Sequence, residues 1–158
     1  MLFRSKSKLL AKIRSGKVAR VCAMGSPIHY MPALAAKLGY DAIWVDAEHR
    51  AWDARDVREV LLRHHHADID CVFRPTSTER GSLARHLEDG AAALMIPMVN
   101  TAERARQLVD LTKFPPLGDR GLDGCGIDAG FWVNKTTDYT TQANRETALV
   151  VQIETPLA

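Results

Sequence analysis

Five short apolar runs, separated by stretches with a helical pattern, constrain the fold of this chain more than any other feature of the sequence. The runs cover residues 18–24, 42–45, 71–73, 91–96 and 148–153. They are rich in Val, Ile and Leu where they are longest, and polar or turn-forming residues bound them. Short apolar runs of this kind are typical of strands that are buried on both faces of a parallel sheet.

Capping residues mark two of the helices between these runs. Asp53 is a candidate N-cap for a helix in which apolar positions recur at i, i+3, i+4 and i+7. The expected buried face of that helix consists of Val57, Val60, Leu61 and His64. Thr101 is a candidate N-cap for a later helix, which carries apolar residues up to Thr112 and cannot continue through Pro115 and Pro116.

Two more helices are expected from weaker signals. One covers residues 32–38 and ends at Gly39. A capping box from Thr76 to Glu79 predicts the other, which runs towards Asp89 and stops at Gly90.

The segment 114–147 is too long and too rich in glycine for a simple connection, and long loops in compact domains usually carry function. A helix is expected near residues 137–145. The element order is then one helix, four strand–helix pairs, this segment and a fifth strand. Such alternation predicts an α/β fold with a parallel sheet and right-handed crossovers, within a single domain.

Composition excludes several classes of function. The chain has 158 residues with 46% hydrophobic and 25% charged side chains, which is ordinary for a globular protein. A net charge of +2 argues against nucleic acid or a membrane surface as a partner, and no run approaches the ~20 apolar residues of a membrane span. The triplet of His64, His65 and His66 is weak metal-site evidence, and we expect it to cap the solvated end of a helix.

The three cysteines indicate a reducing compartment. Cys22, Cys71 and Cys125 are odd in number, far apart and without a CxxC motif, so reduced thiols and a cytoplasmic location are expected. Because Cys22 and Cys71 fall in apolar runs, we expect both to be buried as small hydrophobic residues.

Charged and polar side chains gather at the ends of successive apolar runs. Asp46, Glu48 and His49 follow the second run, Arg74 follows the third, and Pro97 and Met98 follow the fourth. Gln152 lies in the fifth run and Glu154 directly after it. In parallel α/β sheets and (β/α)8 barrels, the carboxyl ends of the strands form the ligand-binding face. The sequence therefore predicts a site that contains an imidazole, a guanidinium and carboxylates.

Each of these residues also has a purely structural interpretation. Arg74 could simply pair with Glu48 or Glu154, and Asp46 could cap the next helix. The convergence of four strand ends on one face favours a site over these alternatives.

Five segments also carry a resemblance to a known family. They are WVDAEH (44–49), VFRP (72–75), DGAAALMIPMV (89–99), FPPLGDRG (114–121) and VVQIET (150–155). In this order and spacing the chain resembles the HpcH/HpaI aldolases, class II pyruvate-dependent enzymes such as 4-hydroxy-2-oxoheptanedioate aldolase and 2-dehydro-3-deoxyglucarate aldolase. The resemblance implies a (β/α)8 TIM barrel of the phosphoenolpyruvate/pyruvate type, assembled as a homo-oligomer, usually a hexamer.

The resemblance also implies roles for individual residues. His49 resembles the catalytic base, which Asp46 would orient, and Arg74 resembles the arginine that binds the substrate and stabilises its enolate. Glu154 resembles one of two carboxylates that hold Mg2+, Mn2+ or Co2+, and Gln152 resembles a substrate contact. The small-molecule partners would be a 2-oxo acid and an aldehyde, joined or cleaved through a metal-stabilised enolate.

The sequence departs from the family pattern in three places. An aspartate in the third helix of the family, thought to raise the basicity of the histidine, is matched here by the longer Glu88, next to Asp89. Asp128 and Ala129 lie near the place where relatives often have an arginine–alanine pair, so aldehyde selectivity is expected to differ. The resemblance places a second metal-binding aspartate beyond residue 158. We therefore expect residues 1–158 to be the N-terminal part of one barrel domain, with about five βα units that end after the fifth strand. We expect this part alone to bind metal weakly.

Three functional hypotheses remain open at this point. The first is the metal-dependent aldolase described above. The second is an acyl-CoA lyase of the citrate lyase β or malyl-CoA type, although the Glu48–His49 pair and the FPP-glycine segment favour the free-acid aldolases. The third is a catalytically inactive fragment that serves folding or assembly.

Overall fold

The computed structural model describes residues 6–132 and 138–156. The helices are α1 (Lys8–Arg14), α2 (Met31–Lys37), α3 (Ala54–His66), α4 (Arg80–Glu88), α5 (Ala102–Thr112) and α6 (Tyr139–Glu146), with a short helical turn η1 (Gly130–Trp132). The strands are β1 (Val21–Met24), β2 (Ala42–Asp46), β3 (Asp70–Arg74), β4 (Ala93–Ile96) and β5 (Ala148–Val151).

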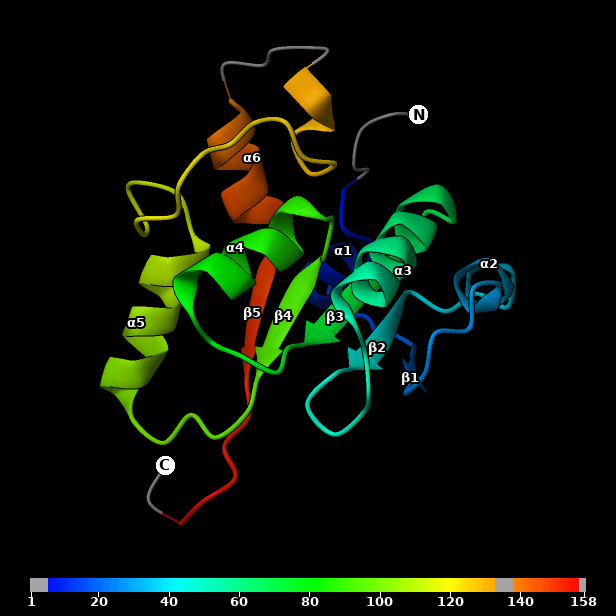
Figure 1. Ribbon diagram of the computed structural model, residues 1–158, viewed down its shortest axis with the longest axis horizontal. Helices are drawn as coiled ribbons and strands as arrows, with labels where there is room; N and C mark the ends of the chain where they lie inside the picture. Colours follow the sequence, from blue (N-terminus) through cyan, green and yellow to red (C-terminus); the bar gives the residue numbers. More distant parts are fainter. Residues whose placement is uncertain (1–5, 133–137, 157–158) are drawn as a thin grey trace.

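All five strands join one parallel sheet in the order of the sequence, β1-β2-β3-β4-β5. Figure 1 shows the strands side by side with their carboxyl ends at one edge, while α6 and the amino end of the described chain lie at the opposite edge. This confirms the predicted α/β fold with strand–helix alternation. Because every strand runs the same way, the residues that end β2, β3 and β5 are brought to a common edge.

Alternation of side chains along the strands separates two layers. One face of each strand packs against α2 to α5 in the main core, which includes Ile43, Phe73, Leu94 and Leu61. The other face carries smaller buried residues, Ala42, Val72 and Ala93, with the larger Trp44, Met95 and Val150 partly buried beside them. This second face, called here the inner face, leads at its carboxyl edge to the candidate site.

Helix α1 lies across the amino ends of the strands, against the inner face. Ser7 caps α1 and donates its hydroxyl to Asp70 at 2.7 Å, and the backbone N–H of Leu9 donates to the same carboxylate oxygen at 2.8 Å. Leu9 packs on Ala42, Val72 and Ala93. The helix therefore covers one end of the inner face and leaves the carboxyl end uncovered.

The helix caps test the local predictions directly. Asp53 caps α3 by accepting from the N–H of Asp56 at 2.7 Å, and Thr101 caps α5 by accepting from Arg104 at 3.1 Å, so both predicted N-caps are confirmed. The capping box at residues 76–79 is wrong: α4 begins at Arg80, and its N-cap Glu79 makes no side-chain cap. A side chain caps a helix only if the chain enters the first turn in the right direction, which residue types alone do not specify.

Several boundaries and exposures differ from the predictions. Strand β1 begins at Val21, β4 at Ala93, and β5 ends at Val151, so the apolar runs extend beyond the hydrogen-bonded strands. The helix expected over residues 32–38 is α2, shifted by one residue, and α6 replaces the helix expected near 137–145, of which residue 137 lies outside the described residues.

The histidine triplet does not simply cap a solvated helix end. His64 is only 1% exposed, and its Nδ1 donates to the Val60 carbonyl at 2.8 Å, so the first member of the triplet belongs to the core. Burial lowers the pKa of His64 to about 4, which keeps it neutral near pH 7.

Cys71 is buried as predicted, whereas Cys22 is half-buried and Cys125 exposed. No helix in the described ranges is long and apolar enough to cross a membrane.

Candidate active site

Arg74 is the centre of the group at the carboxyl ends of the strands. It is the last residue of β3, and its backbone pairs in register with Asp46, the last residue of β2. Alternation along β3 puts Arg74 on the same face as Val72, the inner face. Only 6% of Arg74 is exposed, so its charge must be compensated by neighbouring groups.

Three polar side chains surround this guanidinium. Nε of Arg74 donates to Asp46 Oδ1 at 2.9 Å, and Nη1 donates to Gln152 Oε1 at 3.3 Å. Nη1 also lies 3.0 Å from Glu48 Oε2, an ion pair without hydrogen-bond geometry. The hydrogen bond from Arg74 holds the pKa of Asp46 below its ordinary value, and the same bond raises the pKa of Arg74. Both groups are therefore charged near neutral pH.

An aromatic ring supports the arginine. The guanidinium carbon of Arg74 lies 4.9 Å from the centre of the Trp44 ring, on the neighbouring strand. The sequence reasoning missed Trp44 as a contributor. Its position two residues before Asp46 on the same strand was the available signal, because a period of two puts both side chains on one face.

His49 lies in the loop after β2, beside the arginine group. Its side chain is 64% exposed, and its Nε2 lies 3.5 Å from Glu48 Oε2. Asp46 accepts from the backbone N–H groups of Glu48 at 3.1 Å and His49 at 3.4 Å. Asp46 therefore contacts His49 through its backbone, and the carboxylate next to the imidazole ring is that of Glu48. The role of Asp46 in orienting His49 stays a prediction.

Gln152 and Glu154 follow β5 and approach the end of β4. The backbone N–H of Gln152 donates to the Ile96 carbonyl at 2.9 Å, which extends the strand pairing. Glu154 Oε2 accepts from the backbone N–H of Met98 at 2.8 Å. Met98 has a φ of +55°, a left-handed conformation that side chains with a Cβ rarely adopt. The hydrogen bond to Glu154 stabilises this turn. The Glu154 carboxylate also adds to the raised pKa of Arg74, after the larger effect of Asp46.

Glu88 lies elsewhere in the chain. It ends α4, on the side from which β4 starts, and its backbone carbonyl accepts from the N–H of Asp128 at 3.3 Å. Burial raises the pKa of Glu88. Within one chain, the structure therefore does not bring Glu88 to the strand ends where Arg74 and His49 lie.

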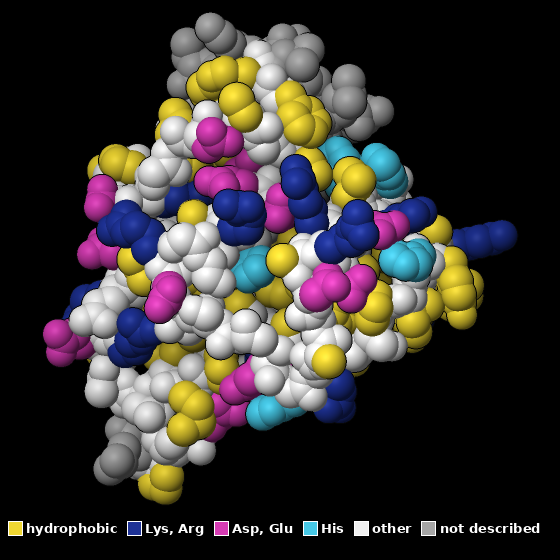
Figure 2. All heavy atoms as spheres, viewed as in Figure 1, with side chains coloured by type: hydrophobic (Ala, Val, Ile, Leu, Met, Phe, Trp, Pro, Cys, Tyr) yellow, Lys and Arg dark blue, Asp and Glu magenta, His cyan; other side chains and the backbone are white. Residues whose placement is uncertain are grey.

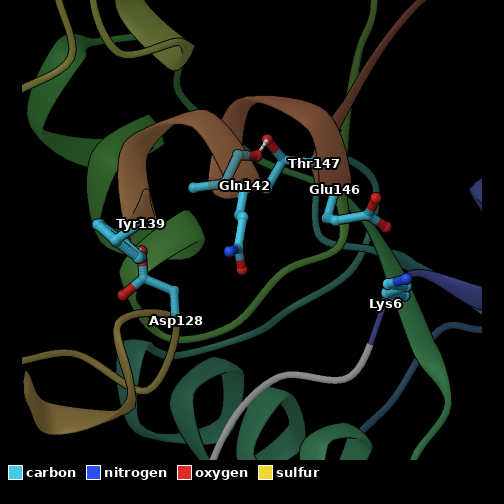
Figure 3. A pocket seen from close by; sticks show the side chains of 7 residues that line it. Lys6, Asp128, Tyr139, Gln142, Glu146 and Thr147 are labelled. Atoms are coloured by element: carbon cyan, nitrogen blue, oxygen red, sulfur yellow. Dashed lines mark hydrogen bonds between the residues drawn. The ribbon is translucent and has the colours of Figure 1, made fainter. Parts of the chain in front are cut away.

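Asp128 also lies away from the strand ends, in a second buried group. It pairs with Arg120 at 2.8 Å and accepts from the Tyr139 hydroxyl at 2.6 Å, as Figure 3 shows for the tyrosine beside a small pocket on α6. Arg120 stacks over Phe114, with 4.4 Å between the guanidinium carbon and the ring centre. The buried ion pair between Arg120 and Asp128 therefore stabilises the glycine-rich segment.

The donor set at the strand ends suits a divalent cation only in part. Glu154 offers a hard carboxylate oxygen of the kind that Mg2+ and Mn2+ prefer, and Gln152 offers an amide nearby. Asp46 and Glu48 are engaged by Arg74. In the parts of the chain that the structure describes, no three His, Cys, Asp or Glu side chains gather in a way that could hold a metal ion.

Comparison with known proteins identifies the relatives of this fold and site. Residues 23–158 match the HpcH/HpaI aldolase/citrate lyase family. The 2-keto-3-deoxy-L-rhamnonate aldolase of Salmonella paratyphi B is 35% identical over 146 residues, which are 92% of this chain and 54% of the relative. The chain thus spans about half the length of the curated relatives it matches.

Solved structures agree with this relationship. An HpcH/HpaI aldolase from Desulfitobacterium hafniense superposes with a TM-score of 0.87 and 30% identity, covering 95% of this chain and 58% of that one. A family member from Burkholderia cenocepacia gives a TM-score of 0.78 and 31% identity over 88% of this chain and 56% of that one. The five-stranded sheet therefore corresponds to part of the TIM barrel of these proteins, as the sequence predicted.

Proposed function

The chain belongs to the HpcH/HpaI aldolase/citrate lyase family, and on that premise we propose that the full-length protein is a metal-dependent carbon–carbon lyase. It would cleave or form a 4-hydroxy-2-oxo acid, with pyruvate and an aldehyde as the other reactants. The observation that carries the proposal is the buried guanidinium of Arg74, fixed by Asp46, Glu48 and Gln152 at the end of a parallel sheet. The name of the Salmonella relatives favours a 2-oxo-3-deoxy sugar acid as the substrate.

Arg74 would stabilise negative charge on the 2-oxo oxygen. Carbon–carbon cleavage, and removal of a methyl proton from pyruvate in the reverse direction, both move negative charge onto that oxygen. A guanidinium remains protonated throughout and needs no reorganisation when its position is fixed in advance. The hydrogen bond to Asp46 and the ring of Trp44 supply that fixed position.

His49 would carry the proton. An imidazole nitrogen can accept a proton from the substrate hydroxyl during cleavage and return it during synthesis. Glu48 lies beside both the imidazole and the Arg74 guanidinium, at 3.5 Å and 3.0 Å. It therefore couples the proton-transferring group to the charge-stabilising group, and we propose it as a positioning residue.

Glu154 would hold the metal ion, which when bound supplies a Lewis acid for the carboxylate and keto oxygens of the 2-oxo acid. Because Oε1 of Gln152 accepts from Arg74, its amide N–H groups remain available to donate to a substrate oxygen. The described residues of this chain contribute Glu154 alone to the proposed metal site, so tight metal binding is proposed only for the full-length protein. The choice among Mg2+, Mn2+ and Co2+ stays open.

The proposal is tested by pyruvate release from 2-keto-3-deoxy-L-rhamnonate and from 4-hydroxy-2-oxoheptanedioate, with Mg2+ or Mn2+, in the full-length natural protein. We expect Arg74→Met to lower kcat/KM by about two to three orders of magnitude, as for removal of one preorganised charge-stabilising group. Glu154→Ala should weaken metal affinity, and Arg106→Gln, on the exposed surface of α5, is the matched control. Unchanged metal affinity and rate in Glu154→Ala would contradict the assignment.

An acyl-CoA lyase is the second candidate, because the matched family also includes citrate lyase. Calorimetric titration with coenzyme A separates the two, since only a thioester lyase needs to bind the nucleotide moiety. Absence of pyruvate release together with absence of coenzyme A binding would instead favour an inactive assembly unit.

Assembly and location remain predictions. A hexameric homo-oligomer is checked by sedimentation of the full-length protein. A cytoplasmic location is supported by the odd number and wide spacing of the three cysteines.

A further inference from the structure

A hollow lies between the outer surfaces of α3 and α4, far from the strand-end group in the fold. Its volume is about 960 Å³, and the turn at residues 125–127 and Phe131 close one end. This is the upper part of the range for pockets that bind small organic ligands. Figure 2 shows dark blue side chains gathered around this region of the helical face, over α3 and α4.

The charge around the hollow is mainly positive. Arg55, Arg58, Arg63 and Arg85 all line it. Arg63 is neutralised by Glu59 at 2.9 Å, and Arg58 is partly neutralised by Asp89 at 3.5 Å. Among the described residues, Arg55 and Arg85 form no ion pair with a carboxylate, and both are exposed. Glu59 and Asp89 also line the hollow, but the four arginines outnumber them, so Arg55 and Arg85 present positive charge from two different helices to the same space.

The closed end of the hollow is apolar. Phe131 is 52% exposed at its rim, and Ile127 and Leu62 contribute to the lining. Phe131 has a φ of +55°, while its backbone N–H donates to the Gly126 carbonyl at 3.1 Å. This tight turn holds a large ring at the rim in a backbone conformation that residues with a side chain rarely adopt. An apolar ligand surface against Phe131 would remove that ring from water.

His86 forms part of the wall of the same space. Its ring packs on Phe73, with 4.5 Å between centres, and Ser82 Oγ lies 3.3 Å from Nε2. Its Nδ1 is buried and has no hydrogen-bond partner in the described ranges. This nitrogen is closed to solvent, so His86 shapes the wall of the hollow through its packed ring.

We propose that the hollow between α3 and α4 binds a small anion with an apolar body, such as an aromatic carboxylate or sulfonate. The anionic group would lie between Arg55 and Arg85, and the apolar body would lie against Phe131. The site is separate from the strand-end group, because α3 and α4 pack on the opposite face of the sheet from Arg74. The inference does not depend on the proposed aldolase activity.

The test uses 8-anilinonaphthalene-1-sulfonate as the probe, with fluorescence titration of this chain. We expect the double variant Arg55→Gln/Arg85→Gln to weaken binding by about tenfold or more, because two charge-assisted contacts are lost. Arg106→Gln, an exposed arginine on α5, should leave affinity unchanged. The uncharged analogue N-phenyl-1-naphthylamine should bind wild-type chain and double variant equally, which separates charge from apolar binding to the inner face.

Protection of a cysteine from alkylation shows whether the probe binds in the hollow. Cys125 lines the hollow and is exposed, whereas Cys22 lies on β1 and is half-buried. Saturating probe should slow alkylation of Cys125, measured by peptide mass spectrometry, and leave the rate at Cys22 unchanged. Full retention of affinity in the folded double variant, or no protection of Cys125, would overturn the proposal. Conversion of a dimer to a monomer by the double variant in sedimentation would also overturn it, since the hollow would then be an interface between copies of the chain.

Discussion

Two arginines of this chain, Arg74 and Arg120, are built into nearly the same local arrangement at opposite edges of the fold. Each is buried, each pairs with an aspartate at 2.9 Å or 2.8 Å, and each stacks over an aromatic ring at 4.9 Å or 4.4 Å. Their surroundings differ. The carboxylate partners of Arg74 are 14% and 26% exposed, and the loop beside them carries an exposed imidazole.

The pair of Arg120 and Asp128 is closed to water. The two side chains are 2% and 7% exposed, and the Tyr139 hydroxyl occupies the same carboxylate oxygen as Arg120. Nε of Arg120 is buried without a hydrogen-bond partner in the described part of the chain. A guanidinium that is fixed yet reachable can act on a ligand, whereas one that is fixed and sealed can only hold the structure together. The difference lies in the access of water, and it decides which arginine is proposed for chemistry.

The largest expected effect is on stability at the sealed pair. Arg120→Met should lower the free energy of unfolding by about 3–5 kcal/mol, because it leaves the Asp128 carboxylate buried without its charge partner. Urea denaturation of this chain measures the loss, and Arg106→Met on exposed α5 is the matched control. A loss no larger than that of the control would mean that Asp128 is solvated and that the two arginine groups are alike.

The Tyr139 hydroxyl should contribute less to the free energy of unfolding than Arg120 does. Tyr139→Phe removes the hydroxyl that donates to Asp128 at 2.6 Å and should cost about 1.5–3 kcal/mol, the usual range for a hydrogen bond to a charged group. Tyr30→Phe, at a tyrosine that is 70% exposed, should have little effect in the same denaturation series. Equal stability of the two phenylalanine variants would rule out a role for the hydroxyl in closing the pair.

Arg74→Met should destabilise the chain less than Arg120→Met, by about 1–2 kcal/mol. Water can reach the Asp46 and Glu48 carboxylates once the guanidinium is gone, so the penalty for an unpaired buried charge is partly relieved. The same substitution should nevertheless remove most of the proposed activity. A stability loss as large as that of Arg120→Met would contradict the distinction between an open and a sealed arginine.

The smallest effect is a change in the acid dependence of stability. The Arg74 hydrogen bond holds the folded-state pKa of Asp46 below its ordinary value of 3.8. This pairing therefore stabilises the fold above that ordinary value, and the contribution is lost as pH falls from there through the folded-state pKa. Denaturation from pH 2 to pH 7 should show a shallower acid limb in Arg74→Met and in Asp46→Asn. An unchanged acid limb in both variants would show that the hydrogen bond does not shift the titration of Asp46.

The sequence could predict the strand-end residues because their signals are local. The apolar runs place Asp46 and Arg74 at strand ends, and parallel strands bring such ends together. Geometry between elements could not be predicted in the same way. Asp46 bonds to the backbone of His49, Glu48 faces the imidazole, and Glu88 lies at the other edge of the sheet.

The sealed pair shows the same limit. Arg120 and Tyr139 are separated in the sequence by a glycine-rich segment with no periodicity, so nothing local indicated that they share Asp128. Residues 133–137 of that segment lie outside the described residues.

The sequence by itself determined the order of the elements, two of the helix caps and the face to which each strand residue points, because these depend on spacing and on contacts within a few residues. Only the tertiary structure decided which polar side chains contact Arg74, since its hydrogen-bond partners Asp46 and Gln152 are 28 and 78 residues away in the chain. It also decided that the carboxylate partners of Arg74 stay partly exposed while the partner of Arg120 is buried. Exposure depends on how loops and helices pack over a side chain, and that packing is set by the whole fold.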